Sequence, residues 1–136
     1  TLQLKLKWGH GNKLAKKMLL TGKGKTCKME KGEIWLTDLP QQRGKEQVGK
    51  RPALIISDTK TSLIIIIPLT SNLELLKYSY TIKINSSEQN LLDKESVAAI
   101  FQLRAIDKQR LLYKIGNLEK TYLKEIDKIL IDLLKL

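Results

Sequence analysis

The fold is decided by a stretch that turns a polar loop into an apolar strand, Gly44-Lys45-Glu46-Gln47-Val48-Gly49-Lys50-Arg51-Pro52-Ala53-Leu54-Ile55-Ile56-Ser57. Its first nine residues include two glycines and four charged side chains, which predict a mobile, polar loop, and its last five predict a strand. Because proline fixes its own φ and favours extended geometry in the residue before it, we expect Arg51 at the mouth of this strand. A guanidinium held beside a mobile loop can bind a phosphate, and the competing interpretation is a solvated loop that closes a hairpin.

Length and composition limit the classes of protein that the chain can belong to. Its 136 residues, of which 42% are hydrophobic, suit one domain with one packed core. No apolar run is long enough to predict a membrane span, and residues 1–28 do not have the pattern of a secretory signal. Cys27 is the only cysteine, which favours a reducing, cytoplasmic compartment. His10 is the only histidine, which excludes a histidine-based zinc site, a Ser-His triad and a ribonuclease site with paired histidines.

The formal net charge of +11 is unevenly distributed along the chain. Residues 1–28 contain eight lysines and no acidic residue, so the remaining 17 basic and 14 acidic side chains give residues 29–136 a charge of only +3. A segment that is rich in glycine and lysine can bury little apolar surface, so residues 1–28 are expected to be a basic, weakly structured extension. The folded domain is expected to span residues 29–136, beginning near Met29.

Periodicity predicts a chain of short strands followed by one helix. Proline is expected to end the first strand at Pro40 and the third at Pro68. A helical turn is possible around Lys108, with Asp107 as its cap. Strands are expected at Glu33–Leu39, Ala53–Ser57, Leu63–Ile67, Tyr78–Ile84, Ser96–Leu103 and Tyr113–Gly116, and an amphipathic helix at 119–135. The predicted fold class is α+β and mainly β, a small antiparallel barrel with a helix laid across it.

Four segments, in order and at workable spacings, resemble one known family. They are residues 32–39, residues 44–52, Leu69-Thr70-Ser71 and the run Gln102-Leu103-Arg104-Ala105-Ile106-Asp107-Lys108-Gln109-Arg110-Leu111. They resemble the MazF/PemK (Kid) toxins, whose members carry a Gly-x-Glu-Gln-x-Gly-x-Arg-Pro loop and a Gln-Ile-Arg-Thr-Ile-Asp-Lys-x-Arg-Leu run. The resemblance covers about residues 30–135 and does not extend to residues 1–28.

The resemblance implies a fold, an activity and partners. The fold would be the SH3-like barrel of the CcdB/PemK type, working as a homodimer. The activity would be sequence-specific cleavage of single-stranded RNA, usually mRNA, without metal or any other cofactor, leaving a 2′,3′-cyclic phosphate and a 5′-hydroxyl. A cognate antitoxin would bind across the dimer and block the RNA groove.

The resemblance also assigns residues. Arg51 and Thr70 match the catalytic pair, and Glu46, Gln47, Ser71 and Gln102 match positions that contact RNA. Two departures from the pattern concern RNA recognition: the connection from Ser57 to Leu63 is shorter than in many members, and Phe101 stands where some members have an acid. The cleavage sequence therefore cannot be carried over from the family.

Elementary chemistry agrees with these roles for two of the residues. Cleavage by a neighbouring 2′-hydroxyl needs a base, stabilisation of a charged phosphorane and a proton for the leaving oxygen. Arg51 suits the second task because it stays cationic and its donors are forked, and Thr70 can donate one hydrogen bond. Glu46 is a candidate base, although a loop carboxylate is more often simply solvated, so the proton transfers stay open.

Two other classes of function are kept beside this one. A gyrase poison of the CcdB kind resembles the same barrel but binds a protein and cleaves nothing, and a non-enzymatic SH3-like binding module would have lost the activity. Trp35 is expected in the core or in a dimer interface rather than as a platform for bases. Lys108 and Arg110 are expected on a solvated face.

Overall fold

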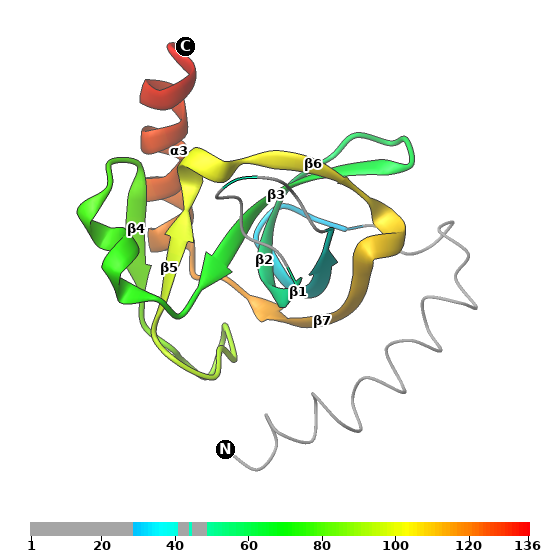
Figure 1. Cartoon of the computed structure of the whole chain (residues 1–136), viewed down its shortest axis with the longest axis horizontal. Helices are drawn as coiled ribbons and strands as arrows, with labels where there is room; N and C mark the ends of the chain where they lie inside the picture. Colours follow the sequence, from blue (N-terminus) through cyan, green and yellow to red (C-terminus); the bar gives the residue numbers. More distant parts are fainter. Residues whose placement is uncertain (1–28, 41–43, 45–48) are drawn as a thin grey trace.

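The computed structural model describes residues 29–40, 44 and 49–136, so the extension over residues 1–28 and the two predicted loop contacts Glu46 and Gln47 lie outside it. The described chain folds into one mostly antiparallel sheet of seven strands with a helix at its C-terminal end (Figure 1). The elements are β1 (Glu33–Leu39), β2 (Gly49–Asp58), β3 (Leu63–Thr70), η2 (Leu73–Lys77), β4 (Thr81–Ile84), β5 (Ser96–Ala99), η3 (Ile100–Gln102), β6 (Arg104–Asp107), η4 (Lys108–Arg110), β7 (Leu111–Asn117) and α3 (Lys120–Leu134).

The strands curl into a barrel-like shape that does not close. Their order is β4-β5-β3-β2-β1-β7, and β6 pairs with β3 beside this path. β3 is therefore the central strand: β2 pairs along one edge as far as Pro68, and on the other edge β6 pairs with residues 63–66 and β5 with Leu69 and Thr70. At the point where β3 changes partner, the sheet forks and one end of the barrel is left open.

Alternation of side chains along the strands gives the sheet two apolar faces. One face packs under α3, and its cluster includes Ile34, Leu54 and Ile67 together with Ile126 of the helix. The other face lines the inside of the curl, and its cluster includes Ile55, Ile64 and Ile106. We call this second set of residues the inner cluster. Side chains at the open end that point to the same face of the sheet therefore project over the inner cluster.

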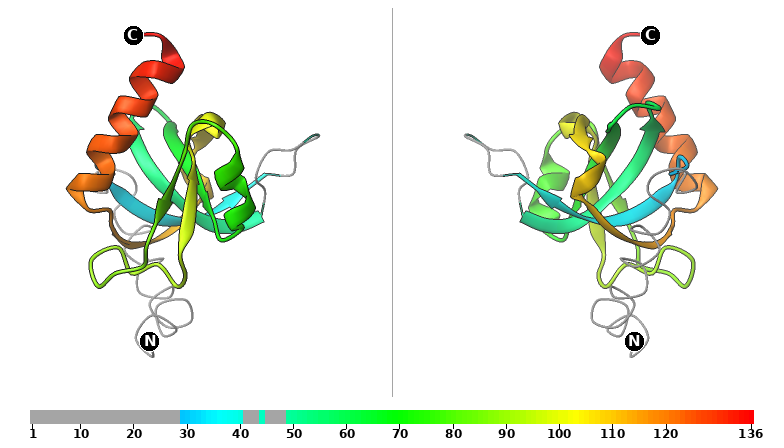
Figure 2. Two further views of the ribbon diagram at one scale, coloured as in Figure 1. Left: turned by 90° about the vertical axis from the view of Figure 1, so that its left-hand side faces the viewer. Right: turned by 90° about the vertical axis from the view of Figure 1, so that its right-hand side faces the viewer.

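The helix α3 lies along one side of the sheet (Figure 2). Ile126 and Leu130 are its buried residues, as expected for an amphipathic helix that packs by one face. It ends at Lys135, which adopts a left-handed conformation with φ of 60°, and the Lys135 backbone N–H donates back to the last turn. No helix of the described part of the chain has the length and hydrophobicity needed to span a membrane.

Several predicted elements are confirmed. β1 has the predicted bounds, α3 agrees to within a residue at each end, and Lys108–Arg110 form the predicted helical turn. Asp107 caps this turn, since its carboxylate accepts a hydrogen bond from the backbone N–H of Gln109 at 2.8 Å. Trp35 is 7% exposed and belongs to the inner cluster, as predicted for a core residue.

Two proline predictions were wrong. β2 begins at Gly49, so Arg51 and Pro52 lie within the strand and not before it. Pro52 is tolerated there because this part of β2 pairs with β1 alone, and its pairing with β3 starts at Ala53. Likewise Pro68 does not end β3, which continues to Thr70 and pairs there with β5 on the edge opposite to β2.

The second half of the sheet also departs from the predicted bounds. β4 begins only at Thr81, because Tyr80 has a φ of 62° that breaks the extended run. β5 ends at Ala99, where the chain enters the short turn η3, so the predicted strand to Leu103 was too long. The segment Arg104–Asp107, left ambiguous by its mixed composition, is the strand β6, and β7 is longer than predicted.

Candidate active site at the open end of the sheet

Arg51 is held in the sheet by the strand beside it. It lies directly opposite Thr37 of β1, and the Thr37 hydroxyl donates a hydrogen bond to the Arg51 carbonyl oxygen at 2.9 Å. Thr37 is fully buried. The backbone that carries the guanidinium is therefore fixed by both the ladder and a buried side chain, which meets the prediction that Arg51 has a held backbone.

The register between β2 and β3 places Arg51 and Thr70 toward the same end of the sheet. Ala53 pairs with Pro68 and Leu54 with Ile67 in an antiparallel ladder that ends there, and Arg51 and Thr70 each lie two residues beyond its last pair. The same alternation puts Arg51 on the face of Ala53 and Ile55, which belong to the inner cluster. The two predicted catalytic residues thus share one end and one face of the sheet.

Thr70 stands at the fork of the sheet. It is 8% exposed, and its Oγ1 accepts a hydrogen bond from the backbone N–H of Asn72 at 3.2 Å. That bond uses a lone pair of the hydroxyl, so its hydrogen can be donated to a ligand. Ser71, a predicted RNA contact, is exposed in the turn that follows.

Arg104 is a residue of this site that the sequence reasoning missed. It opens β6, pairs with Ile66 of β3, and shares the inner face with Ile106 of its own strand. Burial lowers the pKa of Arg51, and the nearby positive charge of Arg104 lowers that pKa further. Arg51 and Arg104 therefore lie on the same face of the sheet, near enough for their charges to interact. The sequence analysis did not predict β6, and without that strand the side chain of Arg104 could not be assigned to the inner face.

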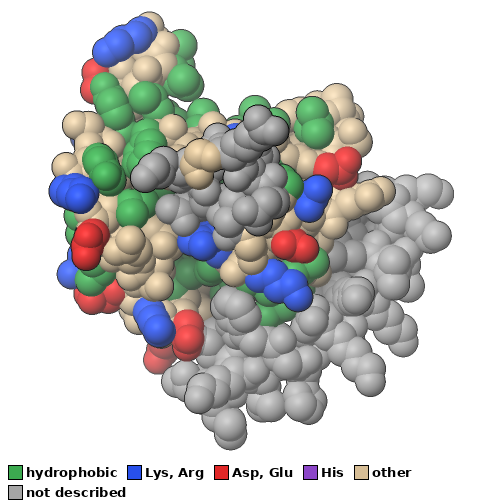
Figure 3. Space-filling view, in the orientation of Figure 1, with side chains coloured by type: hydrophobic (Ala, Val, Ile, Leu, Met, Phe, Trp, Pro, Cys, Tyr) green, Lys and Arg blue, Asp and Glu red, His purple; other side chains and the backbone are tan. Residues whose placement is uncertain are grey.

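Gln102, the other predicted RNA contact in the described chain, lies two residues before Arg104 at the end of η3 and is half-buried. The structure thus brings Arg51, Thr70, Ser71, Gln102 and Arg104 to the open end of the sheet. The end of β1 points toward the viewer in Figure 1, so Figure 3 shows this end, with Lys and Arg side chains near its middle.

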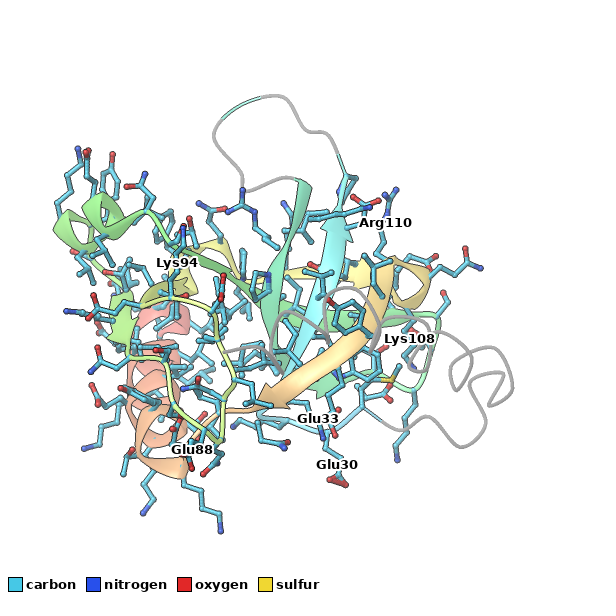
Figure 4. All side chains as sticks on the ribbon, turned by 90° about the horizontal axis from the view of Figure 1, so that it is seen from below. Glu30, Glu33, Glu88, Lys94, Lys108 and Arg110 are labelled. Atoms are coloured by element: carbon cyan, nitrogen blue, oxygen red, sulfur yellow. The ribbon has the colours of Figure 1, made fainter. Side chains whose placement is uncertain are left out.

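Glu30 and Glu33 lie far from the end of β1 that carries Thr37, the partner of Arg51 in the strand pairing. In Figure 4, Arg110 lies at the end where β1 stops, whereas Glu30 and Glu33 lie at the opposite end. Glu33 is engaged there by Lys114, with 3.6 Å between Nζ and Oε2. Glu30 and Glu33 therefore do not compete with a bound anion for the guanidinium groups of Arg51 and Arg104.

A pocket of about 290 Å³ lies on the outside of the same end, lined by Asp38, Asp107, Gln109, Arg110 and Leu112. Arg51 and Thr70 are not among its lining residues. Among residues 29–40, 44 and 49–136, no three His, Cys, Asp or Glu side chains lie together as a candidate metal site.

Comparison with known proteins agrees with this site and fold. Residues 30–134 match the family model of the PemK-like, MazF-like toxins of type II toxin-antitoxin systems. A relative from Staphylococcus saprophyticus, named Endoribonuclease MazF, is 34% identical over 103 residues, which cover 73% of this chain and 85% of the relative.

Solved structures show the same fold. MazF from Deinococcus radiodurans superposes with a TM-score of 0.65 at 25% identity, covering 80% of this chain and 97% of that one. The MazE–MazF structure from the same organism gives a TM-score of 0.56 at 25% identity, covering 77% and 93%. An endoribonuclease from a mycobacterial species, solved with its cognate antitoxin, gives 0.58 at 19% identity, covering 79% and 94%. By the family match over nearly all of its described residues, the chain belongs to the PemK-like, MazF-like toxins of type II toxin-antitoxin systems.

Proposed function

We propose that this protein is an endoribonuclease that cleaves single-stranded RNA, chiefly mRNA, at the open end of its sheet. The observation that supports the proposal is that Arg51 and Thr70 each lie two residues beyond the last pair of the β2–β3 ladder, with the charge of Arg104 near Arg51. The name of the relative from Staphylococcus saprophyticus supports the same activity.

The reaction is an internal transesterification of the RNA, in which the phosphoryl group passes from a 5′-oxygen to the neighbouring 2′-oxygen. The ribose 2′-oxygen bonds to phosphorus while the bond from phosphorus to the 5′-oxygen of the next nucleotide breaks. The 2′-hydroxyl gives up its proton to a base, and the leaving 5′-oxygen gains one. The products are a 2′,3′-cyclic phosphate and a 5′-hydroxyl, and negative charge builds up on the phosphorane between these states.

The two guanidinium groups suit that build-up of charge. Like charges repel, so an anion bound between Arg51 and Arg104 would lower the electrostatic energy of the pair. A phosphorane carries more negative charge than the phosphodiester from which it forms, so the relief is greater in the transition state. Thr70 adds one neutral hydrogen bond to a phosphoryl oxygen.

The remaining predicted residues have supporting roles in this proposal. Glu46 is the candidate base for the 2′-hydroxyl, and Gln47 would contact the RNA from the same loop; both lie outside the described residues. Ser71 and Gln102 flank the catalytic pair, so they would contact the nucleotides beside the cut.

The proposed partners are a cognate antitoxin and a second copy of the chain. The Deinococcus radiodurans neighbour was solved as a MazE–MazF pair, which supports an antitoxin here. Ile131 and Leu134 at the end of α3 are 52% and 49% exposed, which supports a homodimer because a partner would cover these apolar side chains. Sedimentation should give about twice the chain mass at micromolar concentration, and a monomer at tens of micromolar would contradict the dimer.

The proposed cellular site is the cytoplasm, where mRNA is present. Residues 1–28 are proposed to be an extension outside the toxin domain, because the family match starts at residue 30. Their eight lysines could strengthen RNA binding without contributing to the cut.

The experiment that tests the function is incubation with a long single-stranded RNA, with cut sites read at single-nucleotide resolution. We expect cuts at a short recurring sequence, and each cut should leave a cyclic phosphate end. Cleavage should persist in excess EDTA, because the proposed catalytic groups are guanidinium and hydroxyl groups rather than a metal ion. Replacing the ribose at one cut site by deoxyribose should block that site alone. Inhibition of gyrase without any RNA cleavage would instead identify a gyrase poison.

A further inference from the structure

Two aromatic rings lie in contact on the surface of the protein. Tyr78 is 52% exposed and Phe101 is 39% exposed, with ring centres 6.0 Å apart and ring planes inclined by 60°. Phe, Trp and Tyr make up only 5% of the chain, and Phe101 is its only phenylalanine. We call these two residues the aromatic platform. Such exposure is costly for large apolar rings unless a ligand covers them.

The platform is built on the segments that carry the candidate active site. Phe101 directly precedes Gln102 in η3. Tyr78 follows η2, whose first turn is capped by Asn72, and the backbone N–H of Asn72 donates to Thr70. The backbone N–H of Phe101 donates to the Tyr80 carbonyl at 3.3 Å, which ties the two segments together. In Figure 2, η2 lies toward the side to which β1 points, the side of the open end.

A positive charge lies against the platform. The Lys77 Nζ is 5.3 Å from the centre of the Tyr78 ring. Aromatic faces combined with a nearby cation are the usual composition of sites for single-stranded nucleic acid, since bases stack on the rings and the cation neutralises a phosphate.

We propose that the aromatic platform stacks an unpaired base of the RNA beside the cut, with Lys77 against the adjacent phosphate. The placement of this base beside the cut rests on the proposed function. The platform offers the faces of two rings, and the Phe101 ring has no hydrogen-bonding group. It therefore holds a base through its flat face, which tolerates any base, rather than reading its polar edge.

A second copy of the chain is the competing occupant, and the charge argues against it. A protein partner that covered Tyr78 would also bury the ammonium of Lys77, which is costly without a hydrogen-bonded anion. An RNA strand brings the anion with it in every nucleotide. Lys77 is therefore better accounted for by RNA than by an apolar protein surface.

The test compares two probes that differ only in their bases. One is a short adenine oligoribonucleotide, and the other is the same ribose-phosphate chain without bases, both measured by fluorescence anisotropy with the full-length protein. The unsubstituted protein should bind the probe with bases about tenfold more tightly, in line with the usual effect of one stacked base.

Substitutions then assign that preference to the platform. Phe101→Leu and Tyr78→Leu keep an apolar side chain but remove the ring, and each should remove most of the difference between the probes. Phe101→Trp should keep it. Leu76→Ala is the matched control, because Leu76 is also 39% exposed and lies on η2, and it should leave the preference unchanged. Circular dichroism of each variant checks that it folds.

The outcomes separate the platform from the proposed function. If the protein binds the two probes equally, or if Phe101→Leu and Tyr78→Leu keep the full preference, the platform is overturned even when RNA is cut elsewhere on the surface. If these variants convert a dimer to a monomer in sedimentation while keeping the preference, a second copy is the occupant. If no RNA is cut but the preference depends on the rings, the platform stands and the proposed catalysis fails.

Discussion

The hydroxyl of Thr37 donates a hydrogen bond to the carbonyl oxygen of Arg51 at 2.9 Å, across the pair of strands that holds the candidate catalytic arginine. Thr37 is fully buried, so solvent does not compete for this bond. A bond of this kind fixes the strand that aims the guanidinium before any substrate arrives. Preorganisation of this sort is what makes a charged donor effective in a transition state.

Thr37→Val tests this relationship at nearly constant volume. We expect a loss of about 1 kcal/mol of stability, because the Arg51 carbonyl loses its side-chain donor, and a lower cleavage rate at saturating RNA. Urea unfolding and single-turnover kinetics measure the two effects. Thr37→Ser keeps the hydroxyl and should be close to the unsubstituted protein in rate; a serine variant as slow as the valine variant would contradict this role.

The sequence predicted the strands that have clear boundaries and missed those set by tertiary pairing. β1 and α3 were predicted to within a residue because alternation and helical periodicity are local signals. The end of β3 was not, because Leu69 and Thr70 extend the strand past Pro68 by pairing with β5, on the edge opposite to β2. No local pattern contains that long-range pairing.

The candidate site could be predicted in part for a similar reason. Arg51 and Thr70 came from matching motifs, and both lie two residues beyond the last pair of the β2–β3 ladder. Arg104 was missed because its strand, β6, has four residues and no clear alternation, so its side chain could not be assigned to a face. Tyr78 and Phe101 were both predicted to lie in strands, and both lie just outside the shorter strands β4 and β5 that form there.

Gly116→Ala should destabilise the fold by steric overlap. A Cβ at Gly116 would lie 2.6 Å from the carbonyl oxygen of Asn90. Asn90 cannot easily move, since it is fully buried and its side chain accepts from the backbone N–H groups of Ser87 and Leu92. Overpacking of this kind costs roughly 1–3 kcal/mol, measurable by urea unfolding.

The neighbouring residue supplies the control for that substitution. Asn117 is exposed, so Asn117→Ala should change the free energy of unfolding by less than about 0.5 kcal/mol. Equal effects of the two alanine variants would show that the contact between Gly116 and Asn90 is not the reason for the loss.

The ion pair between Asp58 and Lys108 should make stability depend on pH in the acid range. Lys108 Nζ lies 2.7 Å from the Asp58 carboxylate, and hydrogen bonds from the Lys108 side chain, then from the Lys60 backbone, lower the pKa of Asp58 below its ordinary value of 3.8. A carboxylate with a lowered pKa in the folded state stabilises the fold above its ordinary pKa, and this contribution is lost as the pH falls through the lowered value.

Unfolding free energies measured from about pH 6 down to about pH 2 test this contribution. Asp58→Asn should lower stability at the upper end of the range and make the curve flatter toward the lower end. The substitution should matter little below the lowered pKa, where the carboxyl group is protonated in both proteins. A variant curve parallel to that of the unsubstituted protein would contradict the assignment.

A protein that begins at Met29 should keep both fold and activity. Met29 is buried in the inner cluster, and the backbone N–H of Gly32 donates to Ile55, so the described structure is anchored from its first residues. The melting temperature should stay within a few degrees of that of the full chain, while RNA binding should become less sensitive to salt because eight lysines are removed. A large fall in melting temperature would show that residues 1–28 are part of the fold.

The measurement that tests the central claim most directly is the single-turnover rate of RNA cleavage by Arg51→Ala, with Arg110→Ala as the matched control. Arg110 is an exposed arginine at the same end of β1 (Figure 4). Arg51→Ala should lower the rate on the order of a hundredfold or more, and Thr70→Val should lower it less, because it removes one neutral hydrogen bond. Arg110→Ala should leave it nearly unchanged. Cleavage by Arg51→Ala at the unsubstituted rate, or an equal loss in Arg110→Ala, would contradict the account.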